Sequence, residues 1–188
     1  MSAPQIVLIR HGQTEWSRDL KHTGRTDVPL TDAGREQARA LRERLAGREF
    51  ERVLASPMRR ATETCELAGY GAEAELRDEL MEFDYGDYEG RLTEEIRESV
   101  PGWTIWTHGS ANGESPADVG RRLAPVLDEL RETAGDVLVC AHGHVLRVLG
   151  ALWIDLGPEQ GARLALETGS VSRLGWERET PVIVGWNC

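Results

Sequence analysis

The sequence predicts an α/β domain in which helices cover the faces of a β-sheet. Short apolar runs rich in Val and Ile alternate with longer stretches that place an apolar residue every three or four positions. Ser, Thr or Asp precedes several of the longer stretches and Gly follows them, as is typical of helix starts and ends. With 188 residues, the chain suits one domain, residues 1–188, with a single continuous core.

Five apolar runs are expected to form strands. The run VLVCA, within 136–144, is the most typical of a fully buried strand. The last two runs are short, and the turn expected around 179–181 joins them as a terminal pair. The predicted strands span 6–10, 51–56, 136–144, 170–177 and 181–187.

Four stretches are expected to form helices. The second should begin with Ser56 as N-cap and Pro57 at the first helical position, and the third repeats this arrangement with Ser115 and Pro116. Pro125 lies inside the third stretch and should kink that helix or split it in two. The predicted helices span 30–47, 56–69, 114–135 and 145–157.

The stretch 86–114 fits no long element. Glycines interrupt it, and it carries Trp103, Trp106 and His108. This composition predicts an irregular excursion over the sheet, and functional loops are often of this kind.

The net charge excludes several kinds of partner. The chain has 22 Lys and Arg against 32 Asp and Glu, a formal charge of −10. An acidic chain does not suit a broad nucleic-acid or anionic-membrane surface, and no apolar run approaches the roughly 18 residues that a membrane span needs. We therefore expect neither nucleic acid nor membrane as a partner, and any anion site must be local.

The cysteines and the start of the sequence favour a reduced, cytoplasmic protein. Cys65, Cys140 and Cys188 are odd in number and lack C-x-x-C spacing. The opening MSAPQIVLIRHG lacks the basic region and long apolar run of a signal peptide. Whether the protein forms a homodimer stays open.

Polar residues stand at equivalent places after three of the predicted strands. Arg10 and His11 end the first strand, His142 and Gly143 follow VLVCA, and Arg59 lies in the first turn of the helix after the second strand. The carboxyl ends of strands in an open α/β sheet meet at one edge, where ligands bind. Two guanidinium groups and two imidazoles at that edge, with a helix N-terminus, predict a phosphate site.

Five motifs carry a resemblance to a known family. They are RHGQTEW, HTGRTDVPLT, SPMRRATET, EFDYGDYEG and AHGH, and they follow one another between residue 6 and about residue 147. With them the chain resembles the histidine phosphatase superfamily, also called the phosphoglycerate mutase-like family. The remaining residues, about forty, are merely compatible with it. The resemblance implies a three-layer sandwich with a mostly parallel central sheet and helices on both faces.

The resemblance implies catalytic roles for five residues. His11 would be the nucleophile that becomes phosphohistidine, Glu82 the proton donor, and Arg10, Arg59 and His142 the groups that hold the phosphoryl oxygens. The chemistry fits these roles, because a neutral imidazole is available near neutral pH and arginines stabilise the charge on the oxygens in the transition state. His142 is expected to be cationic beside a bound dianion, and no metal or cofactor is expected.

Six further residues are candidates for contacting the substrate. Glycine after His11 and after His142 would let the backbone approach the anion closely. Arg147, one helical turn past HGH, is a candidate partner for a second anionic group. The sequence departs from the family pattern at Gln13, at Ser17 and before Thr23, which leaves the substrate undefined. The six candidates are Gly12, Ser17, Thr23, Gly24, Gly143 and Arg147.

Other polar residues are less clearly assigned. His144 fits a helix cap and a substrate contact equally well. His22 and His108 have no assigned role, and a surface position is preferred for both. Arg60 is expected in a surface ion pair, and Glu89 as the structural partner of a backbone amide or an arginine.

The sequence thus predicts a metal-independent phosphatase that hydrolyses small phosphorylated metabolites, such as sugar phosphates, through a phosphohistidine. EFDYGDYEG and the segment after it resemble the small acid-phosphatase and sugar-bisphosphatase members of the family. Phosphoglycerate mutase is the alternative, although cofactor-dependent mutases are usually longer and exclude water from the site. A metallohydrolase using His11, His142, His144 and Glu82, and a non-catalytic phospho-ligand module, are disfavoured by the arginines and by the complete catalytic set.

Overall fold

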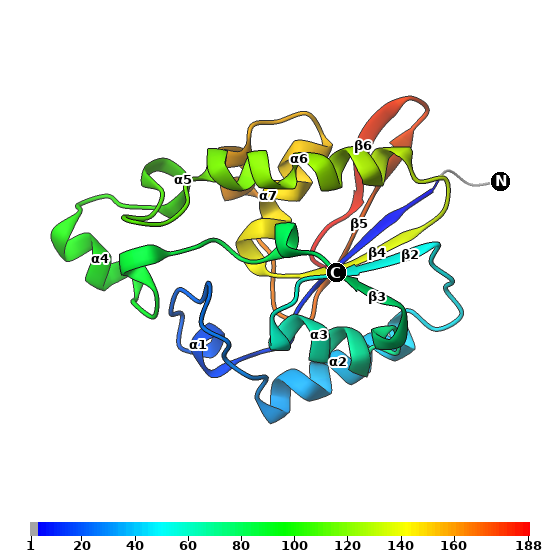
Figure 1. Cartoon of the computed structure of the whole chain (residues 1–188), viewed down its shortest axis with the longest axis horizontal. Coiled ribbons are helices and arrows are strands. Elements are labelled where there is room, and N and C mark those ends of the chain that lie inside the picture. Colours follow the sequence, from blue (N-terminus) through cyan, green and yellow to red (C-terminus); the bar gives the residue numbers. More distant parts are fainter. Residues whose placement is uncertain (1–3) are drawn as a thin grey trace.

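The computed structural model describes residues 4–188, and within them a single sheet of six strands forms the centre of the molecule (Figure 1). The strand order is β3-β2-β4-β1-β5-β6. The first four strands pair in parallel, whereas β5 pairs antiparallel with β1 and with β6. The strands are β1 (Ile6–Arg10), β2 (Arg52–Ala55), β3 (Ala74–Leu76), β4 (Val137–Ala141), β5 (Val171–Glu177) and β6 (Thr180–Gly185).

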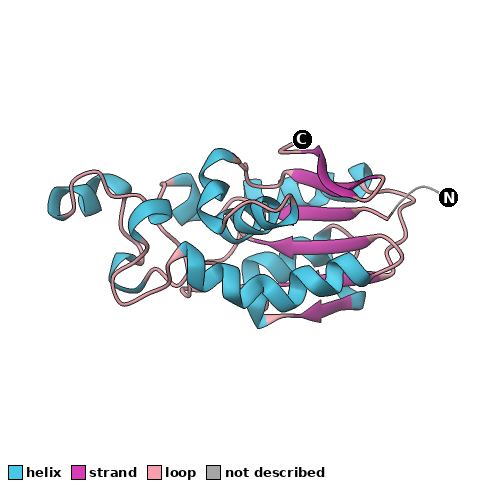
Figure 2. Ribbon diagram, turned by 90° about the horizontal axis from the view of Figure 1, so that it is seen from above, coloured by secondary structure: helices cyan, strands magenta, loops and turns pink. Residues whose placement is uncertain are grey.

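Helices cover both faces of this sheet (Figures 1 and 2). Alternate residues of β1 enter different cores, because successive side chains of a strand point to opposite faces. Ile6 and Leu8 pack with α6 and α7, whereas Val7 and Ile9 pack with α2 and α3. The predicted three-layer α/β sandwich is confirmed. These helices are α2 (Asp32–Arg44), α3 (Arg59–Leu67), α6 (Pro116–Glu132) and α7 (Gly143–Trp153).

Helix α3 begins later than the sequence predicts. Its N-cap is Met58, and Ser56 lies between the end of β2 and the helix. The amide of Ser56 donates to the carbonyl of Cys140 at 2.9 Å, so the pairing of β2 with β4 continues to this residue. The sheet therefore retains Ser56, and the predicted capping role of its side chain is wrong.

Helix α6 is one continuous helix despite Pro125, so the helix is not split in two, and the alternative prediction of a kink stays a prediction. Pro125 lies on the exposed side of the helix, where water can hydrate the carbonyl that proline leaves without a donor. The N-terminus is as predicted: Ser115 is the N-cap, Pro116 follows, and Asp118 completes a capping box.

The segment 86–114 extends beyond the carboxyl ends of the strands, on the side where α4 and α5 lie (Figure 1). It contains no long element, as predicted, but it does contain two short helices, α4 and α5, which the sequence did not predict. Trp103, which belongs to this segment, is buried, and its indole Nε1 donates to the carbonyl of Gly109 at 2.9 Å. The short helical elements are α1 (Glu15–Arg18), α4 (Thr93–Ser99), α5 (Ile105–His108), and the 3₁₀ turns η1 (Gly71–Glu73), η2 (Asp78–Leu80), η3 (Gly86–Tyr88) and η4 (Pro158–Arg163).

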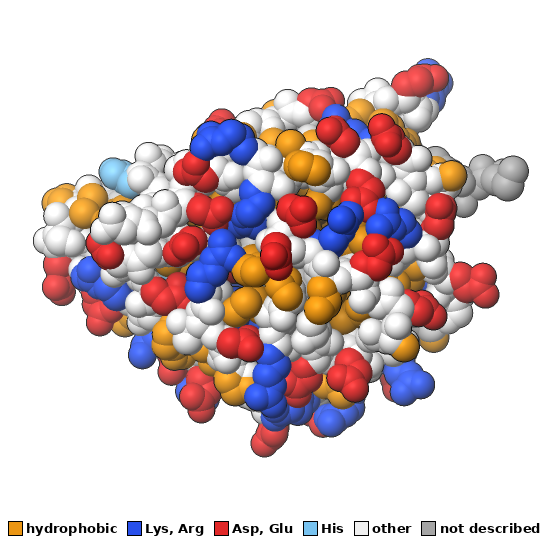
Figure 3. Space-filling model, viewed as in Figure 1, with side chains coloured by type: hydrophobic (Ala, Val, Ile, Leu, Met, Phe, Trp, Pro, Cys, Tyr) orange, Lys and Arg blue, Asp and Glu red, His pale blue; other side chains and the backbone are white. Residues whose placement is uncertain are grey.

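The surface carries both signs of charge. Acidic and basic side chains intermingle across the face drawn in Figure 3. None of the helices formed by residues 4–188 is long and apolar enough to cross a membrane. The three cysteines are free thiols, with Cys65 and Cys140 buried and Cys188 exposed. The expectation drawn from the start of the sequence rests partly on residues 1–3, which lie outside the described residues.

Candidate active site

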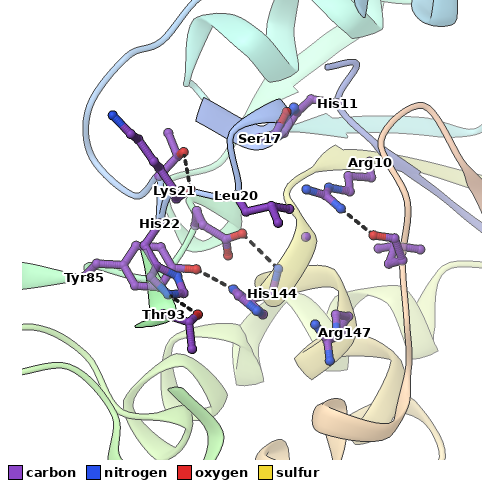
Figure 4. A pocket seen from close by; sticks show the side chains of 14 residues that line it. Arg10, His11, Ser17, Leu20, Lys21, His22, Tyr85, Thr93, His144 and Arg147 are labelled. Atoms are coloured by element: carbon purple, nitrogen blue, oxygen red, sulfur yellow. Dashed lines mark hydrogen bonds between the residues drawn. The ribbon is translucent and has the colours of Figure 1, made fainter. Parts of the chain in front are cut away.

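A pocket of about 340 Å³ lies where β1 and β4 end (Figure 4). Its walls come from the loop after α1, from the segment before α4 and from the start of α7. The topology therefore brings together residues that are far apart in the sequence, as the sheet-edge argument predicts. The sequence-predicted residues that line the pocket are Arg10, His11, Ser17, Thr23, Glu82, Gly143 and Arg147.

His11 is held in one orientation and one tautomer. Only 5% of the residue is exposed, and its Nδ1 lies 2.7 Å from the carbonyl oxygen of Gly12. A carbonyl can only accept, so Nδ1 carries the proton and Nε2 keeps its lone pair. Burial, reinforced by the charges of Arg60 and Arg10, holds the pKa of His11 well below 6.5. His11 is therefore a neutral imidazole with a free nitrogen at neutral pH.

Arg10 is partly buried, and the protein satisfies its guanidinium group only in part. One terminal nitrogen donates to the carbonyl of Leu166, but Nε has no hydrogen-bond partner within residues 4–188. A buried donor without a partner costs about 1–3 kcal/mol. Gly143 leaves room for this group, since a Cβ there would lie 3.2 Å from Arg10 Cζ. Because Arg10 lines the pocket, its guanidinium group is suited to bind an anion there.

Arg60 is buried against His142 and Arg59 is exposed, although Arg60 was expected in a surface ion pair and Arg59 at the phosphate. The side chain of Arg59 is 62% exposed, and its Nε lies 3.8 Å from the Glu63 carboxylate. Arg60 is fully buried, and its Nε donates to Nδ1 of His142 at 3.0 Å. Its terminal nitrogens donate to backbone carbonyls of the loop 23–26.

The periodicity of α3 explains why Arg60 is buried and Arg59 is exposed. Arg60, Thr64 and Cys65 belong to the buried side of the helix, whereas Arg59 stands one turn before the partly exposed Glu63. Residues four apart share a helix face, so the sequence already contained this signal.

His142 is a neutral imidazole fixed between two side chains. Because Arg60 donates to Nδ1, the ring proton is on Nε2, which donates to Ser56 Oγ at 2.7 Å. Burial and the charge of Arg60 lower the pKa of His142 well below 6.5. Its ring centroid lies 5.1 Å from that of His11. The structure thus holds a neutral His142, and the cation expected beside a bound dianion stays a prediction.

The carboxyl group of Glu82 is bound at the N-terminus of α7. Its Oε2 accepts from the amide of His144 at 2.9 Å, and Oε1 accepts from the amides of Val145 and Phe83 at 2.8 and 3.1 Å. Glu82 is 5% exposed and lines the pocket. Oε2 has the single partner, so it retains the capacity to carry a proton toward the pocket.

Ser17 and Thr23 line the pocket but also have local structural partners. Ser17 closes a capping box with Thr14 at the start of α1. The hydroxyl of Thr23 donates to the carbonyl of Lys21 at 3.1 Å. A substrate-binding role for either residue stays a prediction.

Gly12 and Gly24 are required by protein packing. A Cβ on Gly12 would lie 2.2 Å from the carbonyl oxygen of Gly34, and a Cβ on Gly24 would lie 2.2 Å from that of Phe83. The amide of Gly24 donates to both carboxylate oxygens of Glu89 at 2.9 and 3.0 Å. Glu89 therefore has the structural role expected for it.

Arg147 reaches the pocket with a guanidinium group that the protein already contacts. Its Nε donates to the carbonyl of Gly161 at 3.0 Å and its Nη2 to that of Ala162 at 3.1 Å. The group lies 4.5 Å from the ring centroid of Trp106, in a cation–π contact. Binding of a second anionic group by Arg147 stays a prediction.

Two further histidines, His22 and His144, line the pocket, and the sequence gives neither of them a definite role. His22, for which a surface position was preferred, lines the pocket, and its Nε2 lies 3.2 Å from Thr93 Oγ1. Burial lowers its pKa to about 4. His144 also lines the pocket, and its Nδ1 hydrogen-bonds to the hydroxyl of Tyr85 (Figure 4). His108 is exposed, as expected.

The hydrogen bonds of the site do not suit a metal centre. Residues 4–188 contain no group of three or more His, Cys, Asp or Glu side chains arranged to hold a metal ion. Both ring nitrogens of His142 are engaged by Arg60 and Ser56, and Glu82 accepts three backbone amides. The arginines add positive charge where a metal site needs donors.

Comparison with known proteins identifies the class. Residues 6–188 match the model of the histidine phosphatase superfamily (branch 1), and the chain belongs to this superfamily. An acid phosphatase of Mycobacterium tuberculosis is 41% identical over 92% of this chain and 87% of its own length. Sedoheptulose 1,7-bisphosphatase of Saccharomyces cerevisiae is 34% identical over 84% and 70%.

Mutases and a solved structure are also among the similar proteins. A 2,3-bisphosphoglycerate-dependent phosphoglycerate mutase of Mesorhizobium japonicum is 35% identical over 87% of this chain and 88% of its own length. The solved structure of a Mycobacterium tuberculosis open reading frame product superposes with a TM-score of 0.93, at 38% identity over 98% and 97% of the two chains. The predicted family, fold and phosphatase class are confirmed.

Proposed function

We propose that the protein hydrolyses small phosphorylated metabolites without a metal ion, through a phosphohistidine at His11. The observation that supports this proposal most directly is the hydrogen bonding of His11. Its Nδ1–H donates to the carbonyl of Gly12, which leaves Nε2 as the nucleophile. His11 and Arg10 both line the pocket. Arg60, fully buried behind it, supplies a second fixed positive charge.

The first chemical step transfers the phosphoryl group to the enzyme. The lone pair of His11 Nε2 attacks phosphorus, the bond between phosphorus and the leaving oxygen breaks, and Glu82 gives its proton to the leaving alkoxide. The guanidinium groups of Arg10 and Arg60 stabilise the negative charge on the equatorial oxygens. The products are a phosphohistidine, the free alcohol and an ionised Glu82.

The second step returns the enzyme to its starting state. Water attacks phosphorus and gives a proton to Glu82, and the bond between phosphorus and Nε2 breaks with its electron pair returning to His11. Inorganic phosphate leaves. One carboxyl group thus acts as acid and then as base, which requires no metal ion.

The substrate class is supported by the pocket and by the relatives. A pocket of about 340 Å³ suits a small molecule. Two of the similar proteins are named for phosphatase activity on small or unspecified phosphate esters. The phosphoglycerate mutase alternative uses the same first step, and the two functions differ in whether water or a second metabolite accepts the phosphoryl group.

A substrate panel tests the proposal. Phosphate release is measured with sugar phosphates, phosphoserine, nucleotides, phosphoglycerates and p-nitrophenyl phosphate, with and without EDTA. Interconversion of 2- and 3-phosphoglycerate is measured in parallel with added bisphosphoglycerate. We expect EDTA-insensitive phosphate release. Rapid mutase turnover with negligible phosphate release would contradict hydrolysis, and activity lost to EDTA and restored by Zn²⁺ would contradict metal independence.

We propose a cytoplasmic location, which the three free thiols support. The charge of −10 supports a substrate that is a small molecule over nucleic acid or an anionic membrane. Light scattering of the purified protein tests whether it is a monomer or the homodimer that the sequence leaves open.

A further inference from the structure

Arg122 of α6 is fully engaged by the segment that carries Glu82. Its Nη1 donates to the carbonyls of Glu79 at 2.5 Å and Met81 at 2.9 Å, and its Nη2 to the carbonyl of Glu82 at 3.4 Å. Its Nε and Nη2 donate to the two carboxylate oxygens of Glu114, both at 2.9 Å. These five contacts match the five N–H groups of a guanidinium.

Glu114 extends the network to the other side of Glu82. Its Oε2 accepts from the amide of Asp84 at 2.9 Å, and its own amide donates to the carbonyl of Asp84 at 2.8 Å. The side chains of Arg122 and Glu114 are only 17% and 18% exposed, and their bidentate geometry is the strong form of such a pair. The pair therefore fixes backbone groups on both sides of Glu82.

The backbone of residues 81–85 forms neither helix nor strand, so no regular hydrogen-bond ladder sets its position. Three backbone amides, two of them from α7, donate hydrogen bonds to the side-chain carboxyl group of Glu82. At its backbone it is held by Arg122. Arg122 itself does not line the pocket.

We propose that Arg122, paired with Glu114, is a positioning residue for the acid–base function of Glu82. The inference rests on the proposed function, in which Glu82 protonates the leaving alkoxide. Proton transfer requires hydrogen-bond distance between the acid and the leaving oxygen, so a small displacement of the backbone at Glu82 lowers the rate of that transfer. The hydrogen bonds of Arg10 and Arg60 go to groups outside this network.

The test uses the ratio of two activities measured on one sample. Glycerol phosphate has an alkoxide leaving group that needs a proton, whereas p-nitrophenolate leaves without one. The ratio of kcat/KM for glycerol phosphate to kcat/KM for p-nitrophenyl phosphate is independent of the fraction of folded protein. Arg122→Lys keeps the positive charge but removes the planar guanidinium group that binds both carboxylate oxygens of Glu114, and Arg122→Gln removes the charge as well. Arg121→Gln is the matched control, since Arg121 neighbours Arg122 on α6 and is 72% exposed.

We expect Arg122→Lys and Arg122→Gln to lower the ratio about tenfold or more, within the range of general-acid contributions, and Arg121→Gln to leave it unchanged. In a Glu82→Gln background, Arg122→Lys should lower the ratio no further, because the acid is already absent. Equal losses on both substrates, or the same loss of ratio in the Glu82→Gln background, would overturn the inference. An inactive wild-type protein would instead overturn the proposed function, and the inference with it.

Discussion

Arg60 Nε donates a hydrogen bond to His142 Nδ1 at 3.0 Å, and this contact joins the start of α3 to the residue that caps α7. It fixes the tautomer of His142 and directs its Nε2–H to Ser56. It also buries a positive charge beside His11, where that charge helps to keep the imidazole neutral. A sequence-adjacent arginine, Arg59, makes no such contact and is exposed to solvent.

The two arginines should differ sharply on substitution. Arg60→Ala should lower kcat/KM for p-nitrophenyl phosphate by about a hundredfold or more, because it removes a fixed positive charge from the site. Arg59→Ala should retain nearly full activity, since an exposed arginine with one distant carboxylate contributes little. Steady-state assays of both variants, with circular dichroism to verify folding, decide the question. Similar losses for both would contradict the placement of Arg60.

Glu82→Gln should lose far more activity on alkyl phosphates than on p-nitrophenyl phosphate. The amide fills the same space but has no acidic proton to give to an alkoxide, and general acid catalysis contributes about 10²–10⁴-fold. The assay compares kcat/KM for glycerol phosphate and p-nitrophenyl phosphate. A loss of the same size on both substrates would remove Glu82 from the acid role.

His22 should make stability depend on pH. Its pKa is about 4 in the folded protein, compared with 6.5 for an ordinary histidine. The unfolded chain therefore binds more protons between these values, so His22 disfavours folding increasingly as pH falls below 6.5. At pH 5 the effect amounts to about 2 kcal/mol relative to pH 8.

Urea unfolding of the wild type and of His22→Asn at pH 8 and pH 5 measures this contribution. The variant should lose less free energy of unfolding between the two pH values than the wild type does. Any constant difference from the lost contact with Thr93 cancels in that comparison. Equal pH dependence in the two proteins would show that His22 does not titrate as inferred.

Gly12→Ala should destabilise the fold as well as the site. The added Cβ would lie 2.2 Å from the carbonyl oxygen of Gly34, so backbone must move, at a cost of about 1–3 kcal/mol. Gly120→Ala is a control, because its Cβ would meet only the ring of Pro158 at 3.3 Å, within a helix that alanine favours. Thermal unfolding of both variants gives the comparison. An unchanged Tm for Gly12→Ala would show that this contact relaxes freely.

Most of the fold could be predicted because hydrophobic periodicity sets both strands and helices. The buried strand β4 and the cap of α6 at Ser115 agree with the sequence. The start of α3 does not, because the backbone of Ser56 pairs with the sheet, a tertiary contact that no local cap signal reveals. Which of the two adjacent arginines is buried follows from the periodicity of α3, since Arg60 shares the buried side of the helix with Thr64.

The site could be predicted where a residue follows directly from a strand end, as for His11 and His142. It could not be predicted where a loop of irregular backbone folds over the pocket. Tyr85 reaches the pocket wall from such a segment, and Thr93 reaches it from the first residue of the short helix α4. The position of His22 beside them depends on that packing. Irregular backbone has no period from which a facing side can be deduced.

The most direct test of the account is the detection of phosphate on His11. The wild-type enzyme is mixed with p-nitrophenyl phosphate, quenched in base within milliseconds, digested and examined by mass spectrometry. We predict an acid-labile, base-stable phosphoryl group on His11, and neither phosphoenzyme nor turnover in His11→Ala. Phosphate on another residue, or more than about a tenth of wild-type activity in His11→Ala, would contradict the phosphohistidine mechanism.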